Sequence, residues 1–170
     1  MLLRGSRIDH LILSGIILAG ILLIFYILAH STSAPDQPIA FSHKIHAGDY
    51  EIPCQFCHPF AERSPVAGVP SVRLCMGCHQ ITAAQKPEVQ NLKTYWDKDE
   101  PVPWVRVHNL PGHVRFAHQP HIRKGLTCRE CHGPVETMDR VRKAAPLSMG
   151  WCVRCHVKRD ADRDCMVCHH

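Results

Sequence analysis

The chain has 170 residues and a formal net charge of +5, and 45% of its residues are hydrophobic although only 6% are aromatic. This apolar content argues against a disordered chain, and ten cysteines with fourteen histidines argue against an ordinary cytosolic globular domain. The excess of cysteine and histidine indicates that metal or haem organises the protein.

An apolar stretch without charged residues occupies residues 11–29. Its length matches the roughly 20 residues that cross a bilayer as a helix, and it exceeds the core of a signal peptide, which has about 7–15 residues. A cleaved signal peptide is the rival interpretation, with a weak cleavage site after Ala34 that the following Pro35 disfavours.

Flanking charge predicts the orientation of this segment. Arg4 and Arg7 precede it, and positive residues prefer the cytoplasmic side of a membrane. We therefore expect a single-pass protein of the bacterial inner membrane, with its cysteine-rich part in the oxidising periplasm. The expected regions are a cytoplasmic N-terminus at 1–10, a transmembrane helix at 11–29, a linker at 30–40 and a periplasmic domain at 41–170.

All ten cysteines fall into five Cys-x-x-Cys pairs, and a histidine directly follows each pair. In chain order, the first to fifth motifs are Cys54-Gln-Phe-Cys57-His58, Cys75-Met-Gly-Cys78-His79, Cys128-Arg-Glu-Cys131-His132, Cys152-Val-Arg-Cys155-His156 and Cys165-Met-Val-Cys168-His169. Cys-x-x-Cys-His is the attachment sequence of c-type haem, in which two thioethers hold the porphyrin and the histidine is the proximal iron ligand. Zinc sites, disulfides and thioredoxin-like pairs do not require this recurring histidine. The sequence thus predicts five covalent haems.

The charge of the haems must be added to the net charge of the polypeptide. Each ferric haem with two ionised propionates adds about −1, so five haems bring the holoprotein close to neutrality. The basic composition is therefore no indication of nucleic-acid binding, and no nucleic-acid partner is expected.

Few residues are available for each haem, so the expected fold is a small, loop-rich, mainly α domain in which haems form the core. Thirteen prolines and ten glycines agree with this expectation. One helix is predicted to begin at Pro87, with Val89, Leu92 and Trp96 on one face. It either covers a haem or is an ordinary amphipathic surface helix.

Two similar segments precede the first and third motifs: Phe41-Ser-His43-Lys-Ile-His46 and Phe116-Ala-His118-Gln-Pro-His121. This pattern resembles the cytochrome c3/c7 group of multihaem cytochromes, in which such a segment supplies distal imidazoles to two haems. The resemblance implies two c7-like halves, at about residues 41–86 and 112–170.

The same resemblance implies a set of distal iron ligands. His43 would serve the haem of the first motif, His118 that of the third, His121 that of the fourth, and His46 a further haem of the first half such as that of the second motif. For the haem of the fifth motif, Met149 and His108 are alternatives, and Met149 would depart from the all-histidine pattern.

A more specific resemblance covers residues 35–170. The segments that carry it begin at Phe41, Ser64, Pro103, Cys131 and Leu147, and they read FSHKIHAG, SPVAGVP, PWVRVHNLP, CHGPVETM and LSMGWC. They look like the pentahaem membrane-anchored cytochrome subunit of alternative complex III, a bacterial quinol oxidoreductase. This family implies an iron–sulfur subunit, quinol-site membrane subunits and a monohaem cytochrome c as partners. It also implies a periplasmic acceptor such as a cytochrome c, a copper protein or an oxidase.

The residues themselves favour a membrane-tethered electron carrier, because six-coordinate haem iron favours electron transfer over substrate binding. We expect no substrate-converting site in this chain. Two alternatives stay open: a stand-alone multihaem quinol dehydrogenase, and a multihaem enzyme with one open haem.

Overall fold

The computed structural model describes residues 7–31 and 34–169, with side chains described from Asp9 to Tyr26 and from Ala34 to His169. The chain forms two compact units, residues 1–33 and 34–170. Most of the expected cytoplasmic N-terminus, at 1–6, lies outside the described residues, as do 32–33 of the expected linker.

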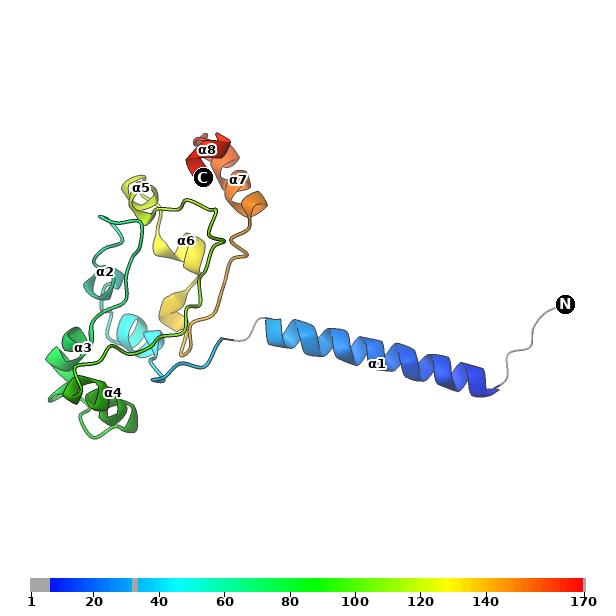
Figure 1. Ribbon diagram of the computed structural model, residues 1–170, viewed down its shortest axis with the longest axis horizontal. Coiled ribbons are helices and arrows are strands. Elements are labelled where there is room, and N and C mark those ends of the chain that lie inside the picture. The colour runs from blue at the N-terminus through cyan, green and yellow to red at the C-terminus, as the bar shows by residue number, and fades with distance from the viewer. Residues whose placement is uncertain (1–6, 32–33, 170) are drawn as a thin grey trace. The chain divides into compact units, whose positions relative to one another are not determined.

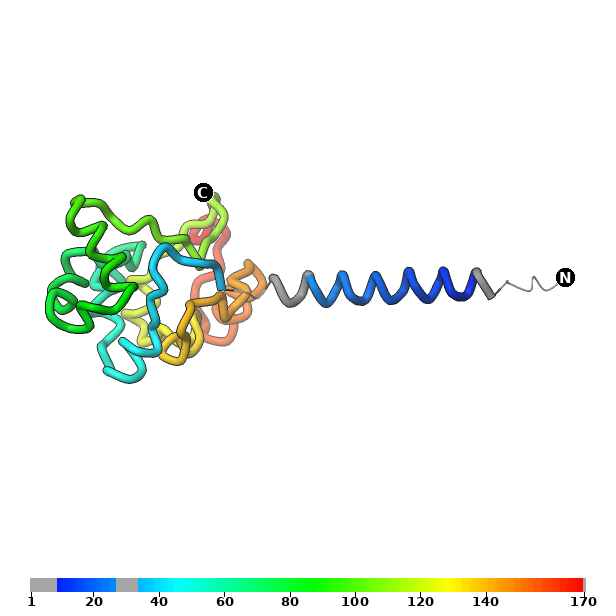
Figure 2. The backbone as a smooth tube through the Cα atoms, turned by 90° about the horizontal axis from the view of Figure 1, so that it is seen from below, coloured from blue at the N-terminus to red at the C-terminus, as the bar shows by residue number. Residues whose placement is uncertain are grey.

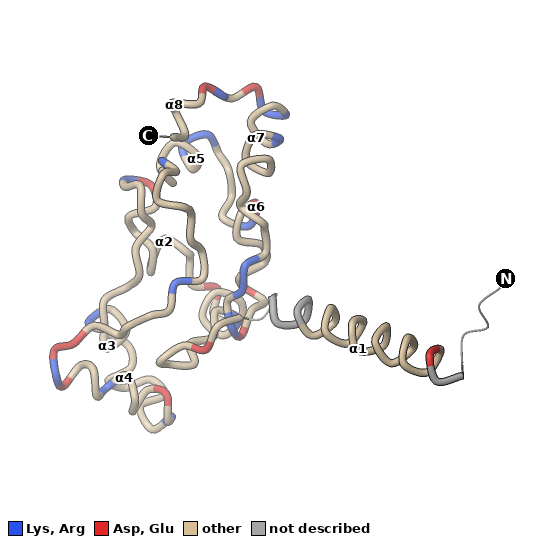
Figure 3. Tube along the Cα trace, turned by 45° about the vertical axis from the view of Figure 1, so that its right-hand side comes forward, with Lys and Arg blue, Asp and Glu red and all other residues tan. Residues whose placement is uncertain are grey.

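The described part of the first unit is one helix, α1, which extends from Arg7 to Ser31 and is therefore longer at both ends than the expected transmembrane segment (Figure 1). Its stretch Asp9–Tyr26 is long and apolar enough to cross a membrane, a property that an N-terminal signal sequence shares. Asp9 is the only charged residue in this stretch (Figure 3). The hydroxyl of Ser14 donates to the carbonyl oxygen of Leu11 at 2.9 Å, so this polar group is satisfied within the helix.

The second unit consists of short helical turns joined by loops (Figure 2). Its elements are the π-helical turn η1 (Lys44–Asp49), α2 (Cys54–Cys57), α3 (Val72–His79), α4 (Pro87–Asp97), α5 (His118–Arg123), α6 (Cys128–His132), the 3₁₀ turn η2 (Val135–Thr137), α7 (Met149–Lys158) and α8 (Cys165–Cys168). Residues 34–169 contain no β-strand, only an isolated antiparallel bridge between Val114 and His169. The predicted mainly helical, loop-rich fold is confirmed.

Helix α4 begins at Pro87, where the sequence places it. Proline suits a first helical position because its missing N–H has no partner within the helix. The carboxylate of Glu88 accepts a hydrogen bond from the backbone N–H of Ala40 at 2.8 Å, which ties α4 to the start of the unit. Leu92 is buried in the helix's inner face, whereas Trp96 is 38% exposed.

The only side-chain core among the described residues lies around α3 and α4. Ile39, Met76, Leu92 and Val102 are buried together. Outside this cluster, Ala61 and Met138 are the only buried hydrophobic residues in the described chain. The polypeptide therefore supplies a core to one end of the unit and very little to the remainder, as expected where covalent groups provide the packing.

Candidate haem-binding sites

Each of the five motifs lies on a short helix: on α2, α3, α6, α7 and α8 in chain order. Residues three apart on a helix share a face, so the two cysteines of each motif point to the same side of their turn. The histidine follows within the helix or directly after it. This is the arrangement that two thioethers and one axial imidazole on a single porphyrin require.

Side-chain caps define where four of these helices begin. Ser71, Thr127, Ser148 and Asp164 accept hydrogen bonds from backbone N–H groups in the first turns of α3, α6, α7 and α8. At α6 the cap is reciprocal, since the Glu130 carboxylate accepts from the Thr127 N–H at 3.0 Å. Capping fixes the turn and with it the relative position of each cysteine pair.

The histidine rings are oriented by the backbone. Seven of them donate Nδ1–H to a carbonyl oxygen, so in the neutral ring Nε2 carries the free lone pair that can bind a metal. The pairs are His58 with Gly68 (2.7 Å), His79 with Thr82 (2.9 Å), His156 with Asp162 (2.5 Å), His169 with His113 (3.4 Å), His46 with Ser42 (2.8 Å), His118 with Pro65 (2.8 Å) and His121 with Ala117 (2.8 Å). Four of the seven are expected proximal histidines and three are expected distal histidines.

Three pairs of rings have the spacing of axial ligands. A metal–imidazole bond is about 2 Å long and the ring centre lies about 1 Å behind its nitrogen, so two imidazoles on opposite sides of one iron have centres about 6 Å apart. The ring centres of His46 and His79 are 6.0 Å apart. Those of His118 and His132 are 6.2 Å apart, with the rings 10° from parallel. Those of His121 and His156 are 6.1 Å apart.

His43 lies near His58 of the first motif. Burial, followed by the proximity of His58, lowers the pKa of His43 to about 4, so its imidazole is neutral at neutral pH. A neutral ring is the form that binds a metal ion. The Nδ1 of His43 is buried without a protein hydrogen-bond partner.

The two distal segments have matching local geometry. Phe41 meets His43 edge-on at 4.9 Å and lies over His46 at 4.3 Å and 26°. In the second segment Phe116 meets His118 edge-on at 4.9 Å and His121 at 4.9 Å and 33°. In both segments the second histidine donates to the carbonyl of the residue after the phenylalanine. The sequence repeat is therefore also a repeat in structure.

The structure places His108 beside the third motif. Its ring centre is 4.4 Å from that of His132, with the planes 80° apart, which is too close for two ligands on opposite sides of one iron. Burial, followed by Lys143 and His118, lowers the pKa of His108. Burial, followed by His108, also lowers the pKa of His132, to about 4. The structure thus places His108, a candidate ligand for the haem of the fifth motif, beside His132 of the third motif.

The fifth motif lies beside His113 and the segment ahead of α5. His113 has its ring centre 5.6 Å from that of His169, with the ring planes 24° apart. An isolated antiparallel bridge pairs Val114 with His169, which brings the backbone next to His113 against the end of α8. Met149 is the first residue of α7 and is 67% exposed.

Thiols of different motifs lie close together in the polypeptide. Burial, then Cys54, then Cys78 raise the pKa of Cys57. Burial, then Cys54, raise the pKa of Cys128. Each of these cysteines therefore has a neighbour in another motif. None of the ten cysteines forms a disulfide, so all are available for thioether formation.

The donor set as a whole fits c-type haem. Paired thiols on one face of a turn, imidazoles oriented through Nδ1, and ring pairs at the axial spacing are the groups that such a cofactor needs.

Comparison with known proteins agrees with this geometry. Residues 28–110 match the class III cytochrome C family, and residues 114–170 match cytochrome c7 and related cytochrome c. A curated relative is the multiheme cytochrome c subunit of menaquinone reductase from Nitratidesulfovibrio vulgaris. It is 28% identical over 164 residues, with 81% of this chain and 78% of the relative covered.

The fold and the sequence matches therefore indicate a c3/c7-like multihaem cytochrome c domain. Among such proteins, the chain is similar to the multiheme cytochrome c subunit of a menaquinone reductase. Proteins of this class carry covalently bound haem c.

Proposed function

We propose that this protein is the electron-transfer subunit of a quinol-oxidising membrane complex of the alternative complex III type, and that it passes electrons through five c-type haems to a periplasmic acceptor. The observation that carries the proposal is the set of imidazole pairs at 6.0, 6.1 and 6.2 Å. Two strong axial ligands close the iron to substrates and leave one-electron transfer as its chemistry.

We assign the distal ligands from the same spacing. His46 serves the haem of the second motif, His118 that of the third and His121 that of the fourth. His43, which lies near His58, serves the haem of the first motif. For the fifth motif Met149 is the proposed ligand, because His108 lies against His132 instead.

Helix α1 is proposed to anchor the protein in the inner membrane with the haem domain in the periplasm. Its exposed apolar side chains from Leu11 to Tyr26 suit contact with lipid or with a partner's helix. An iron–sulfur subunit, quinol-site membrane subunits and a monohaem cytochrome c are the proposed partners.

The relative favours a second candidate in which the electrons flow the other way. That protein belongs to a menaquinone reductase, so a similar subunit can deliver electrons to a quinone. The proposed haem set would serve either direction, because haem electron transfer is reversible and its direction depends on the potentials of the two partners.

The decisive experiment uses the complex isolated intact from membranes. Identification of its subunits, a mass that includes five haems on this chain, and rapid reduction of its haems by a quinol would support the proposal. Reduction only by a periplasmic donor, followed by quinone reduction, would establish the second candidate. Quinol oxidation by this chain alone would establish a stand-alone dehydrogenase, and a high-spin haem that binds carbon monoxide in the native protein would establish an open-haem enzyme.

Substitution of His118 by alanine tests the ligand assignment. We expect one haem to change from low spin to high spin, as measured by electron paramagnetic resonance and visible absorption, because its second axial ligand is lost. His113→Ala is the control and should leave the four haems of the first to fourth motifs low spin. A fully low-spin spectrum of His118→Ala would reject the assignment.

A further substitution tests the ligand of the fifth haem. We expect Met149→His to lower the potential of one haem, since bis-histidine ligation has a lower potential than histidine–methionine ligation. An unchanged redox titration would remove Met149 from the ligand set.

A further inference from the structure

We propose that the five haem motifs form one unbranched row in the order second, first, third, fourth, fifth, because the two halves of the domain join through their equivalent first and third motifs. The inference rests on the proposed function in two respects, the presence of five haems and the assignment of His46 and His121 as distal ligands. It adds the route that an electron follows and the two places where it enters and leaves.

The join between the halves is reciprocal. The backbone N–H of Lys44, in the first distal segment, donates to the carbonyl of Met138, which follows the third motif, at 3.0 Å. The backbone N–H of His118, in the second distal segment, donates to the carbonyl of Pro65, which follows the first motif, at 3.3 Å. The first half thus contacts the loop after the third motif, and the second half contacts the loop after the first motif.

Reciprocal contacts of this kind are typical of a two-fold interface, in which equivalent patches meet each other. A further hydrogen bond strengthens one side of the join, from the Ser42 hydroxyl to the Asp139 carboxylate at 2.9 Å. On the other side, the ring of His118 also donates to Pro65. The two halves therefore contact each other through both distal segments, beside the first and third motifs.

Motif residues meet across this join. Cys54 and Cys128, the first cysteines of the two equivalent motifs, lie near each other, since Cys54 contributes to the raised pKa of Cys128. His58 of the first motif likewise lies near His132 of the third. The first and third motifs are consequently adjacent and occupy the centre of the row.

The row continues outwards in both directions. On one side, Cys57 of the first motif neighbours Cys78 of the second, and Phe41 separates the distal rings that serve these two motifs. On the other side, Cys131 of the third motif neighbours Cys155 of the fourth. An ion pair between Arg159 and Glu130 joins the helices that carry the third and fourth motifs.

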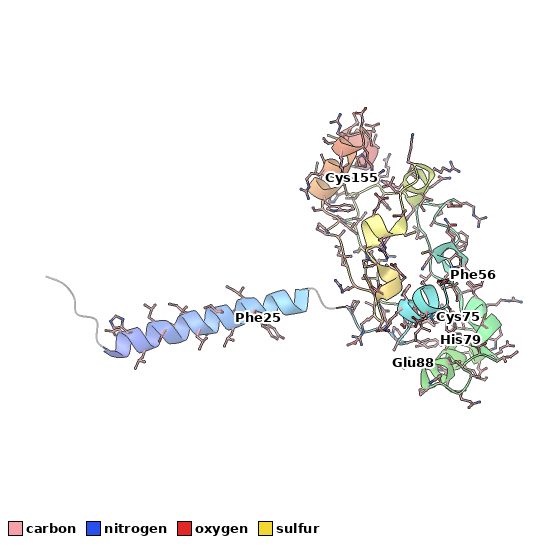
Figure 4. All side chains as sticks on the ribbon, turned by 180° about the vertical axis from the view of Figure 1, so that it is seen from behind. Phe25, Phe56, Cys75, His79, Glu88 and Cys155 are labelled. Atoms are coloured by element: carbon pink, nitrogen blue, oxygen red, sulfur yellow. The ribbon has the colours of Figure 1, made fainter. Side chains whose placement is uncertain are left out.

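The fifth motif extends the row beyond the repeat. Cys152 of the fourth motif neighbours Cys168 of the fifth. The backbone N–H of Arg115 donates to the carbonyl of Cys168 at 2.7 Å, which holds α8 against the segment ahead of α5. The ribbon agrees with this order, since α3 lies at one end of the haem domain, α2 and α6 lie between, and α7 and α8 lie at the other end (Figure 1). Cys75 and His79 are correspondingly distant from Cys155 (Figure 4).

The order has a functional consequence. With a haem bound at every motif, an electron that entered at one end would reach the other end by one-electron exchange between neighbouring motifs, in which the haem that gave up the electron would be oxidised and its neighbour reduced, with no bond made or broken. The end at α3 and the end at α8 are therefore the entry and exit points for the quinol-site and periplasmic partners.

The test uses equivalent histidines of the two halves in the full-length protein. His46→Met and His121→Met each raise the potential of one haem by exchanging imidazole for thioether. Redox titration followed by haem methyl resonances in NMR then counts how many other haems change their potential. We expect His46→Met to shift one neighbour, that of the first motif, and His121→Met to shift two neighbours, those of the third and fifth motifs.

Equal numbers of shifted neighbours in the two variants would overturn the row, as would a shift of the third haem in His46→Met. If a variant loses the altered haem, the potentials of the four remaining haems are compared with those of the unaltered protein. The haems whose potentials change are then the neighbours of the missing haem. The outcome is independent of quinol oxidation, so a failed row and a failed functional proposal are distinguished.

Discussion

Two regions of the haem domain differ in how many side chains they bury. One is the α3–α4 end, and the other is the C-terminal half, residues 114–169. The first has its own side-chain core of Ile39, Met76, Leu92 and Val102. In the second, Met138 is the one buried hydrophobic residue among those described. The difference indicates that side chains fill the core at one end of the domain, whereas in the other region the core is left to the cofactors.

The largest effect is expected from removal of a haem attachment site in the C-terminal half. Cys152→Ala combined with Cys155→Ala should leave α7 and α8 without their main packing partner. We expect near-complete loss of amide protection in both helices, measured by hydrogen–deuterium exchange. The matched variant, Cys75→Ala with Cys78→Ala, should retain protection in α4 because that helix packs on its own core. Equal loss in the two variants would remove the distinction between the regions.

A smaller effect is expected from a cavity in the side-chain core. Leu92→Ala should lower the free energy of unfolding by about 2–5 kcal/mol, since it removes buried methyl groups that the surroundings cannot replace. Chemical denaturation measures the change. Val157→Ala is the control in the C-terminal half, where the side chain is 55% exposed, and should change the stability by less than about 0.5 kcal/mol.

The smallest effect is expected at the end of α6. Gly133 follows His132 with φ of 72° and ψ of −168°, a conformation that side chains disfavour, and a Cβ there would lie 2.5 Å from that of Ala144. Gly133→Ala should therefore destabilise the protein by about 1–3 kcal/mol in thermal unfolding. Gly112→Ala has nothing within 4 Å of the added Cβ and serves as the control. A neutral result at Gly133 would mean that the loop after the third motif adjusts freely.

Local features of this structure were accessible from the sequence. Pro87 and the spacing of Val89 and Leu92 predicted α4, and the repeated Phe-x-His-x-x-His pattern predicted two segments of like geometry. These features depend on neighbouring residues, whose spacing is visible in the chain.

Features that depend on distant residues were not accessible. The proximity of Cys54 to Cys128 and the position of His108 against His132 arise from the packing of segments far apart in sequence. The core was also only partly visible, because Ile39 and Val102 come from loops on either side of α3 and α4 and no periodic pattern includes them. Which distant residues become neighbours can be determined only from the three-dimensional structure.

The scarcity of buried side chains between Val114 and His169 also bears on how the protein matures. The polypeptide in this region has too little buried apolar surface to form a compact state by itself. We therefore expect its thiols to stay accessible until haem is attached, and folding of this half to depend on that attachment.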